Sequence, residues 1–570
     1  MKLQLTLIYS LCLLIFTSCN KNSKKESNDP YNFNFERNYS ENNNEFSWEI
    51  SGTYFKIRKD TINKFEGNSS CSIINPNNLK SSTGRLRIFQ KVRICPTNNE
   101  IKISIYLKGK KIQNCMIKAY LLDQNEQIVI EDSLAFHPSI DWTNYNFKLK
   151  NADCELLFLE FIIGKGSEIW VDNLNVTQNG ESINILRNKE ISNSQIFGNR
   201  IIEKSFLWQK DSELSLSDSL TDFENYNVVG IGETVHGAKE MVLYRNSLIK
   251  YLIKKYNYTT VILEAPDFYM NEANKFINGE ISDERILMNY RKHFAQYYNY
   301  AISNIELFKW LKEYNLKHDN NVVVLGMDVS HEWRTYIHKY LGKFNFPIIN
   351  EIDNNIKSHN IKTAVDIINK NQDFLVDKMG ATYYDSLQFI VKKIIDFNSV
   401  YDSRSNNKSR DLIMYHNIIK LIPPDKNESC QKTIICGHFE HLGKGTFLND
   451  PLTKTVGSML ADELKDKYFV IAEITGGGTN QSGSFFIQPN SINKLQKPDD
   501  SSIEFLFKNM NNCYVNTNDI SKDIPELITI RSIGGRINDF NQFVTCNFKT
   551  RCDGIIYIKE CTPIEIVLSQ

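Results

Sequence analysis

The 570-residue sequence has no excess of charge of either sign, because 67 Lys and Arg residues balance 67 Asp and Glu residues. A chain with neither a net positive charge nor a basic tail lacks the electrostatic footprint of a nucleic-acid-binding protein. No CxxC pair is present, so a cysteine-based zinc cluster is not indicated. Disorder of the whole chain is excluded as well, since 41% of the residues are hydrophobic and 12% are aromatic.

Long apolar runs are also missing, and the one at residues 3–16 is too short to span a bilayer, which takes about 20 apolar residues. Small residues and Cys19 follow this run, as in a bacterial signal peptide. The segment resembles a lipoprotein signal, which implies cleavage before Cys19 and lipid attachment to its thiol. We therefore expect a signal peptide and lipobox at 1–19, a polar tether at 20–44, and a lipid-anchored cell-envelope protein on the periplasmic side or the outer surface. A short transmembrane anchor is the alternative.

The ten cysteines that follow the predicted signal peptide, which itself contains Cys12 and Cys19, are scattered along the chain without paired spacing. Free cysteines are among the most often buried residues, so we expect most of these to be buried thiols. An exported location would permit disulfides, but the sequence does not determine their pairing.

Short alternating segments separated by polar turns occupy residues 45–177. Period-two runs at this spacing predict an antiparallel β-sandwich. The pattern resembles the jelly-roll modules of carbohydrate-binding type in exported bacterial proteins, some of which hold a structural calcium ion and some a sugar. Two roles remain open for this module: it contacts a glycan, or it is a purely structural spacer. The polar, Asn-rich segment 178–195 is predicted to be a linker.

Residues 196–570 show a different periodicity, in which unbroken apolar runs alternate with helical patterns. These runs lie at 228–231, 259–266, 322–328, 433–438, 468–473 and 554–560. Such an alternation predicts an α/β domain, a mostly parallel sheet flanked by helices. A helical insert is expected at about 350–422, so the complete fold is this α/β domain preceded by an all-β jelly-roll sandwich.

Ionisable residues follow four successive predicted strands at the point where each strand ends. They are Glu233 and His236, then Glu264, then Asp328, then His438 and His441. One Glu or His at a strand end is more often a cap or a structural side chain. Because the carboxyl ends of parallel strands converge on one crevice, several in succession predict a catalytic site there.

The motifs that contain these residues resemble those of the erythromycin esterase family, from about residue 200 to the end of the chain. They are Gly232-Glu233-Thr234-Val235-His236-Gly237 with Glu240, Leu263-Glu264-Ala265, Gly326-Met327-Asp328, Arg410-Asp411 with Met414 and Asn417, and His438 with His441. The resemblance implies hydrolysis of a small-molecule ester or lactone, in the named members the macrolactone of macrolide antibiotics. It also implies activated water as the nucleophile, with no required metal or cofactor.

The residue types fit this chemistry. Histidine, with a reference pKa of about 6.5, accepts a proton from water near neutral pH, so His236 is the predicted general base. Glu233 and Glu264 would orient it and favour its charged form. His438 or His441 would stabilise the oxyanion or protonate the leaving alkoxide.

Four further residues are predicted to support the site or bind substrate: Glu240, Asp328, Arg410 and Asp411. Arg410 is a candidate for holding one of the carboxylates, although a helix salt bridge would explain it nearly as well. No GxSxG elbow is present, so a covalent serine mechanism has little support.

Two departures from the family pattern leave the substrate, and macrolide cleavage in particular, open. Phe439 follows His438 where the family commonly has Asn, and Thr234-Val235 replaces a pair that is often Ala-Thr.

Two alternative functions remain at this stage. The same acids and histidines could hold a divalent ion in a metal-dependent hydrolase or peptidase, because His and carboxylate ligands together bind ions that activate water. Alternatively, the protein is a glycan-binding surface lipoprotein whose large domain is a degenerate scaffold, which the intact set of acids and histidines argues against.

Overall fold

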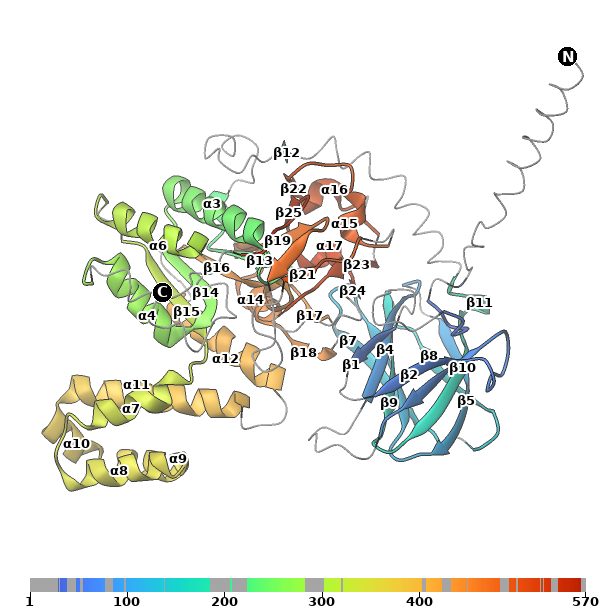
Figure 1. Ribbon diagram of the computed structural model, residues 1–570, viewed down its shortest axis with the longest axis horizontal. Coiled ribbons are helices and arrows are strands. Elements are labelled where there is room, and N and C mark those ends of the chain that lie inside the picture. Colours follow the sequence, from blue (N-terminus) through green and yellow to red (C-terminus); the bar gives the residue numbers. More distant parts are fainter. Residues whose placement is uncertain are drawn as a thin grey trace, which may run out of the picture.

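In the computed structural model, the chain forms a β-sandwich and an α/β domain with a helical insert (Figure 1). The predicted fold class is therefore confirmed. The residues that the structure describes are 29, 31–37, 48–51, 55–76, 86–96, 99–137, 139–184, 206–207, 223–281, 302–318, 321–401, 406–422, 432–448, 450–481, 492–498, 501–522, 524–525, 527–534 and 542–564. The predicted signal peptide and Cys19 lie outside them. Within these ranges, no helix combines the length and apolar character needed to cross a membrane.

The sandwich consists of two antiparallel sheets packed face to face. One sheet has the order β1-β4-β9-β6-β7, with β1 Glu49–Ser51, β4 Leu86–Arg93, β9 Leu156–Ile163, β6 Met116–Leu122 and β7 Ile128–Ala135. The other has the order β2-β3-β10-β5-β8, with β2 Lys56–Asp60, β3 Ser70–Ile74, β10 Glu168–Gln178, β5 Glu100–Lys111 and β8 Thr143–Lys150, and β11 Glu181–Ser182 pairs with β10. Alternate residues of β5 are buried, as its period-two pattern predicts.

The sandwich extends beyond both ends of the predicted 45–177 segment. Tyr31, Phe33 and Phe35 are buried in its core, inside the segment predicted to be a tether. The rings of Phe33 and Phe35 pack against Trp48, and Tyr31 stacks on Phe33. At the other end, Ile183 is buried in the same core, inside the predicted linker.

The α/β domain is built on an eight-stranded sheet with the order β12-β22-β25-β19-β13-β16-β14-β15. The strands are β12 Phe206–Leu207, β22 Cys513–Asn516, β25 Gly554–Ile558, β19 Tyr468–Thr475, β13 Val228–Glu233, β16 Thr433–His438, β14 Thr260–Pro266 and β15 Val323–Asp328. The six strands from β25 to β15 are parallel, and β22 and β12 add an antiparallel edge. The predicted mostly parallel sheet is therefore confirmed.

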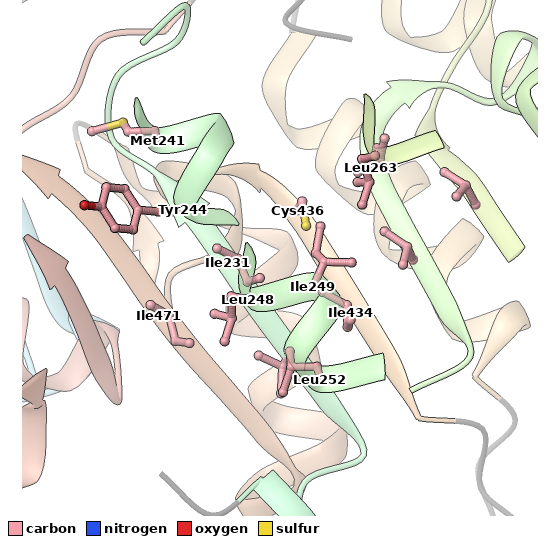
Figure 2. Close-up of a cluster of buried hydrophobic side chains, with 14 of the residues drawn as sticks. Ile231, Met241, Tyr244, Leu248, Ile249, Leu252, Leu263, Ile434, Cys436 and Ile471 are labelled. Carbon is pink, nitrogen blue, oxygen red and sulfur yellow. The ribbon is translucent and has the colours of Figure 1, made fainter. Parts of the chain in front are cut away.

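Helices cover both faces of this sheet. One face packs against α3 Lys239–Tyr256, α4 Asp267–Ile277 and α6 Ile302–Asn315, and the other against α12 Asn406–Leu421, α14 Val456–Leu464 and α15 Ile503–Leu506. Figure 2 shows Met241, Tyr244 and Leu248 of α3 against Ile231 and Ile471 of the sheet. Burial on both faces explains why these strands are apolar at every position and not at alternate ones.

The helical insert lies between β15 and β16 and has a hydrophobic core of its own. Its helices are α7 Glu332–Leu341, α8 Pro347–Lys357, α9 Ile361–Lys370, α10 Gln372–Met379 and α11 Ala381–Tyr401, and α12 leads back to the sheet. The insert begins earlier than the predicted residue 350. The expectation of buried thiols is confirmed, because the nine cysteines of the described residues are unpaired and eight of them are buried.

Short elements complete the α/β domain. They are η2 Phe223–Asn225, α13 Phe439–Leu442, β17 Thr446–Phe447, β18 Asp450–Lys454, η5 Lys465–Lys467, β20 Thr479–Gln481, β21 Ile492–Lys494, α16 Thr517–Ile520, β23 Ile528–Arg531, β24 Phe543–Cys546 and α17 Phe548–Arg551.

Candidate active site

The order of the strands brings the predicted site residues to one edge of the sheet. The strands β13, β16, β14 and β15 are neighbours, and their carboxyl ends carry Glu233, His438, Glu264 and Asp328. Glu233 and His438 are directly paired in register. Residues that are up to about 200 positions apart in the sequence thus lie at the same place in the fold, as expected for parallel strands.

His236 forms a close pair with Glu233. Nδ1 of His236 lies 2.6 Å from Oε1 of Glu233, and the carboxylate can only accept, so Nδ1 carries the proton and Nε2 the lone pair. The Glu233 side chain is 1% exposed and the His236 side chain 15% exposed, so it is the imidazole that reaches the surface of the site. Behind the pair, Nη1 of Arg245 lies 3.6 Å from Oε2 of Glu233.

The turn after β13 fixes the position of His236. The backbone N–H of His236 donates to the carbonyl of Ile533, and the carbonyl of His236 accepts from the side chain of Asn480. The next residue, Gly237, has a φ of 73°, and a Cβ there would lie 1.8 Å from the carbonyl oxygen of Gln481. Only glycine fits this turn, which the sequence places directly after the histidine.

His438 is held in the neutral state. Burial, with the charge of His236 acting in the same direction, lowers the pKa of His438 well below its ordinary value. Nδ1 of His438 accepts the backbone N–H of Glu440 at the start of α13. A neutral imidazole whose Nδ1 accepts carries its proton on Nε2, so this histidine can donate a hydrogen bond without being charged. Its ring lies 4.8 Å from that of His236, centroid to centroid.

Glu264 and Asp328 share the guanidinium of Arg410. Nη2 of Arg410 lies 2.8 Å from Oε1 of Glu264 and 2.9 Å from Oδ2 of Asp328. The other Glu264 oxygen accepts the backbone N–H of His438 at 2.7 Å. Burial alone would raise the pKa of Glu264, but the charges of His441 and Arg410 outweigh it and hold that pKa well below the usual range. Glu264 is therefore ionised, and Arg410 is a member of the site and not a surface salt bridge.

His441 is the second histidine with a carboxylate partner, since its Nδ1 lies 2.9 Å from Oδ1 of Asp411. Burial disfavours the imidazolium, but Asp411 and Glu264 outweigh it and raise the pKa of His441 to about 9. The protonated ring directs its Nε2–H toward Oε1 of Glu264 at 3.6 Å. Nε2 also lies 3.0 Å from Nη1 of Arg410. Because a guanidinium only donates, Nε2 accepts this hydrogen bond when the ring is neutral. His441 thus has a partner in either protonation state.

A guanidinium occupies the position where the carboxylates converge. A divalent ion bound by Glu264, Asp328 and His441 would have to displace Arg410, which already contacts all three. Among the described residues, no group of three or more His, Cys, Asp or Glu side chains is arranged to hold a metal ion.

One predicted residue stands apart from this network. The carboxylate of Glu240 accepts the backbone N–H and the hydroxyl of Thr562, at 2.6 and 2.8 Å. Glu240 therefore joins the first turn of α3 to the C-terminal segment. The other predicted supporting residues, Asp328, Arg410 and Asp411, lie within the network described above.

Sequence reasoning missed two buried ionisable residues behind His236, namely Arg245 and Glu473. Arg245 lies on the apolar stripe of α3 that includes Met241 and Leu248, and a cation in such a stripe signals a buried partner. Glu473 lies on β19 and is paired in register with Glu233. The other site residues were predicted because they stand at the ends of predicted strands. Glu473 also stands at the end of one, so the same criterion would have identified it.

The carboxyl edge of this parallel sheet thus carries two histidine–carboxylate pairs, His236 with Glu233 and His441 with Asp411. Residues 381–561 match the family model described as Erythromycin esterase. The matched region includes Arg410, Asp411, His438 and His441.

Known proteins resemble both parts of the chain. Erythromycin esterase type II from Escherichia coli is 22% identical over 432 residues, which are 63% of this chain and 98% of that protein. A succinoglycan biosynthesis protein of known structure shares the fold of the large domain, with a TM-score of 0.54 and 16% identity over 66% of this chain and 99% of that one. A carbohydrate-binding module solved with β-1,4-galactotriose matches at a TM-score of 0.21 and 15% identity, over 27% of this chain and 100% of that one.

Proposed function

We propose that this protein hydrolyses a carboxylic ester or a lactone with a water molecule that His236 activates. The observation that carries the proposal is the 2.6 Å contact between Nδ1 of His236 and Oε1 of Glu233, on a domain of the erythromycin esterase type. Glu233 fixes the tautomer with the lone pair on Nε2 and stabilises the imidazolium that forms when the ring takes a proton.

In the first step, His236 removes a proton from water as the water oxygen attacks the carbonyl carbon. A C–O bond forms, and the carbonyl oxygen becomes an oxyanion. Neutral His438, with its proton on Nε2, would donate a hydrogen bond to this oxyanion. A neutral donor suits this position, since a second cation beside the imidazolium of His236 would be repelled.

In the second step, the bond to the alkoxy oxygen breaks and the leaving alkoxide takes a proton. His441 is the proposed acid, because its raised pKa keeps it protonated at neutral pH. After turnover His441 takes up a proton from solvent, and Asp411 and Glu264 stabilise the imidazolium. The products are a carboxylic acid and an alcohol, and His236 releases its proton to solvent.

The substrate is proposed to be a small molecule with an ester or macrolactone bond. The 22% identity to erythromycin esterase type II supports macrolide inactivation, and with it a role in antibiotic resistance, as the finer form of the proposal. Incubation of the chain from residue 20 onward with macrolides and simple esters, followed by mass spectrometry, tests both levels. The gain of one water by a macrolide supports macrolide inactivation. A gain by simple esters alone supports ester hydrolysis but not macrolide inactivation, and no gain in any compound contradicts both proposals.

We further propose that the mature protein is attached to the cell envelope through a lipid on Cys19. A Cys19→Ser variant should move from the membrane fraction to the soluble fraction with its enzymatic activity intact. Equal membrane retention of this variant would contradict lipid attachment at that residue.

A further inference from the structure

The turn between β6 and β7 of the sandwich fixes the position of one side chain, that of Glu126. The Asp123 carboxylate accepts the backbone N–H groups of Asn125 and Gln127, at 2.9 and 2.8 Å. These bonds hold Glu126 at a φ of 60°, a conformation that non-glycine residues seldom adopt. A glutamate in this conformation, at the tip of a hairpin, would ordinarily face water.

Glu126 instead is 1% exposed and lies against the α/β domain. One carboxylate oxygen pairs with Lys91 of the sandwich at 2.5 Å and with Arg551 of α17. The other accepts the backbone N–H of Asn547 at 2.6 Å. The charges of Arg551 and Lys91 outweigh the effect of burial and lower the pKa of Glu126 to about 2, so a fully buried carboxylate joins the two domains.

Further contacts surround this ion pair. The backbone carbonyl of Gln124 accepts hydrogen bonds from Asn547 and Thr550, both at 3.1 Å. Leu527 of the α/β domain is buried in the core of the sandwich. Figure 1 shows β1, β4 and β7 on the side of the sandwich that meets β24. The sandwich is thus joined to the α/β domain by specific buried contacts.

Arg551 also binds the segment that follows His441. Nη1 of Arg551 donates to the carbonyl of Thr446 at 2.8 Å, and its backbone carbonyl accepts the N–H of Lys444 at 2.9 Å. The Thr446 hydroxyl also donates to the backbone carbonyl of Glu126, at 3.4 Å. Phe447, the next residue, packs edge-on against the ring of His441 with the centroids 5.5 Å apart.

We propose that Glu126 is a positioning residue for hydrolysis. Through Arg551 it fixes residues 444–447, against which His441 packs, so the β-sandwich completes the active site of the α/β domain. This inference rests on the proposed function only in giving His441 a catalytic role. The positioning itself is a property of the fold and can be measured without a substrate.

The test compares Glu126→Gln with Glu131→Gln in the full-length protein. Glu131 lies on the same hairpin and pairs with Lys118 at 2.8 Å on the surface, so its substitution controls for loss of an ion pair in β6 and β7. Hydrogen exchange of peptides that cover residues 439–448 should speed up in Glu126→Gln and stay unchanged in Glu131→Gln. With any ester that the protein hydrolyses, kcat should fall on the order of 10- to 100-fold in Glu126→Gln, with KM nearly unchanged.

A Lys91→Met/Glu126→Gln/Arg551→Met variant covers the case in which uncompensated buried cations prevent folding, because Lys91 and Arg551 both pair with Glu126 and neutral replacements of buried ion pairs are generally tolerated. This variant also removes the ion pair between Glu126 and Arg551, so hydrogen exchange at 439–448 should be faster in it as well. Wild-type exchange at 439–448 in a folded variant, or an equal increase in Glu131→Gln, would overturn the positioning role. If the protein hydrolyses no ester, the proposed function fails, and the exchange measurement still decides the role of Glu126.

Discussion

Glu233 and Glu473 are paired in register on the neighbouring parallel strands β13 and β19, and both side chains are almost completely buried. Two adjacent buried carboxylates repel each other, so the site favours one charge and not two. Burial raises the pKa of Glu473 well above its ordinary value, although Arg245 opposes the rise. Burial therefore favours the neutral form of Glu473, while Glu233 is the carboxylate that contacts His236.

This division of charge predicts opposite outcomes for two matched substitutions. Glu473→Gln replaces a neutral acid by a neutral amide of the same shape, so kcat/KM should change little. Glu233→Gln removes the charge that orients and stabilises His236, so kcat/KM should fall by about 10²- to 10⁴-fold. Kinetics of the two purified variants on one ester provide the comparison, and an equal loss in both would show that Glu473 is not a neutral bystander.

The second prediction concerns the alkaline limb of the pH profile. If His441 is the acid, activity requires its protonated form and declines as the pH rises through its pKa of about 9. Asp411 is a main cause of that raised pKa. In Asp411→Asn the alkaline limb of kcat/KM should therefore move to lower pH. An unchanged limb in a folded, active variant would remove His441 from the acid role.

The third prediction separates a guanidinium-based site from a metal-based one. Because Arg410 neutralises Glu264 and Asp328, prolonged incubation with a chelator should leave activity unchanged. Arg410→Lys keeps the charge but cannot reach both carboxylates and His441 at once, so kcat/KM should fall about tenfold or more. Activity that is lost on chelation and restored by a divalent ion would instead support the metal-dependent hydrolase.

The fourth prediction uses the close packing beside Glu264. A Cβ at Gly437 would lie 2.9 Å from Oε2 of Glu264 and 2.9 Å from its Cβ, while a Cβ at Gly534 would have no heavy atom within 4 Å. Gly437→Ala should displace the carboxylate that accepts the N–H of His438 and lower kcat at least tenfold. Gly534→Ala is the control and should behave like the wild type. Equal kinetics of the two variants would show that the position of Glu264 is not critical.

The sequence predicts which residues end the strands but not the order of the strands in the sheet. Apolar runs that stop at Glu233, Glu264, Asp328 and His438 are readable because strands buried on both faces are apolar at every position. The placement of β16 between β13 and β14 depends on how distant segments pack, which no local pattern records. This order is what brings His438 next to His236.

Other features of the site depend on tertiary contacts that sequence patterns do not describe. The Asp411 partner of His441 is 30 positions away, and only the packing of α12 on the sheet brings the two together. Glu240 belongs to the first motif by sequence, yet the chain returns at Thr562 and binds it. The contact of Glu126 with Arg551 crosses between domains whose patterns, taken separately, predict only a sandwich and an α/β fold.

The most direct test of the central claim is the activity of His236→Ala on any ester or macrolide that the wild-type protein hydrolyses. His331→Ala, at an exposed histidine before α7, is the matched control. With circular dichroism and melting temperature unchanged, kcat/KM of His236→Ala should fall by about 10²- to 10⁴-fold, and that of His331→Ala should stay at the wild-type value. Undiminished turnover by folded His236→Ala would contradict the assignment of the base.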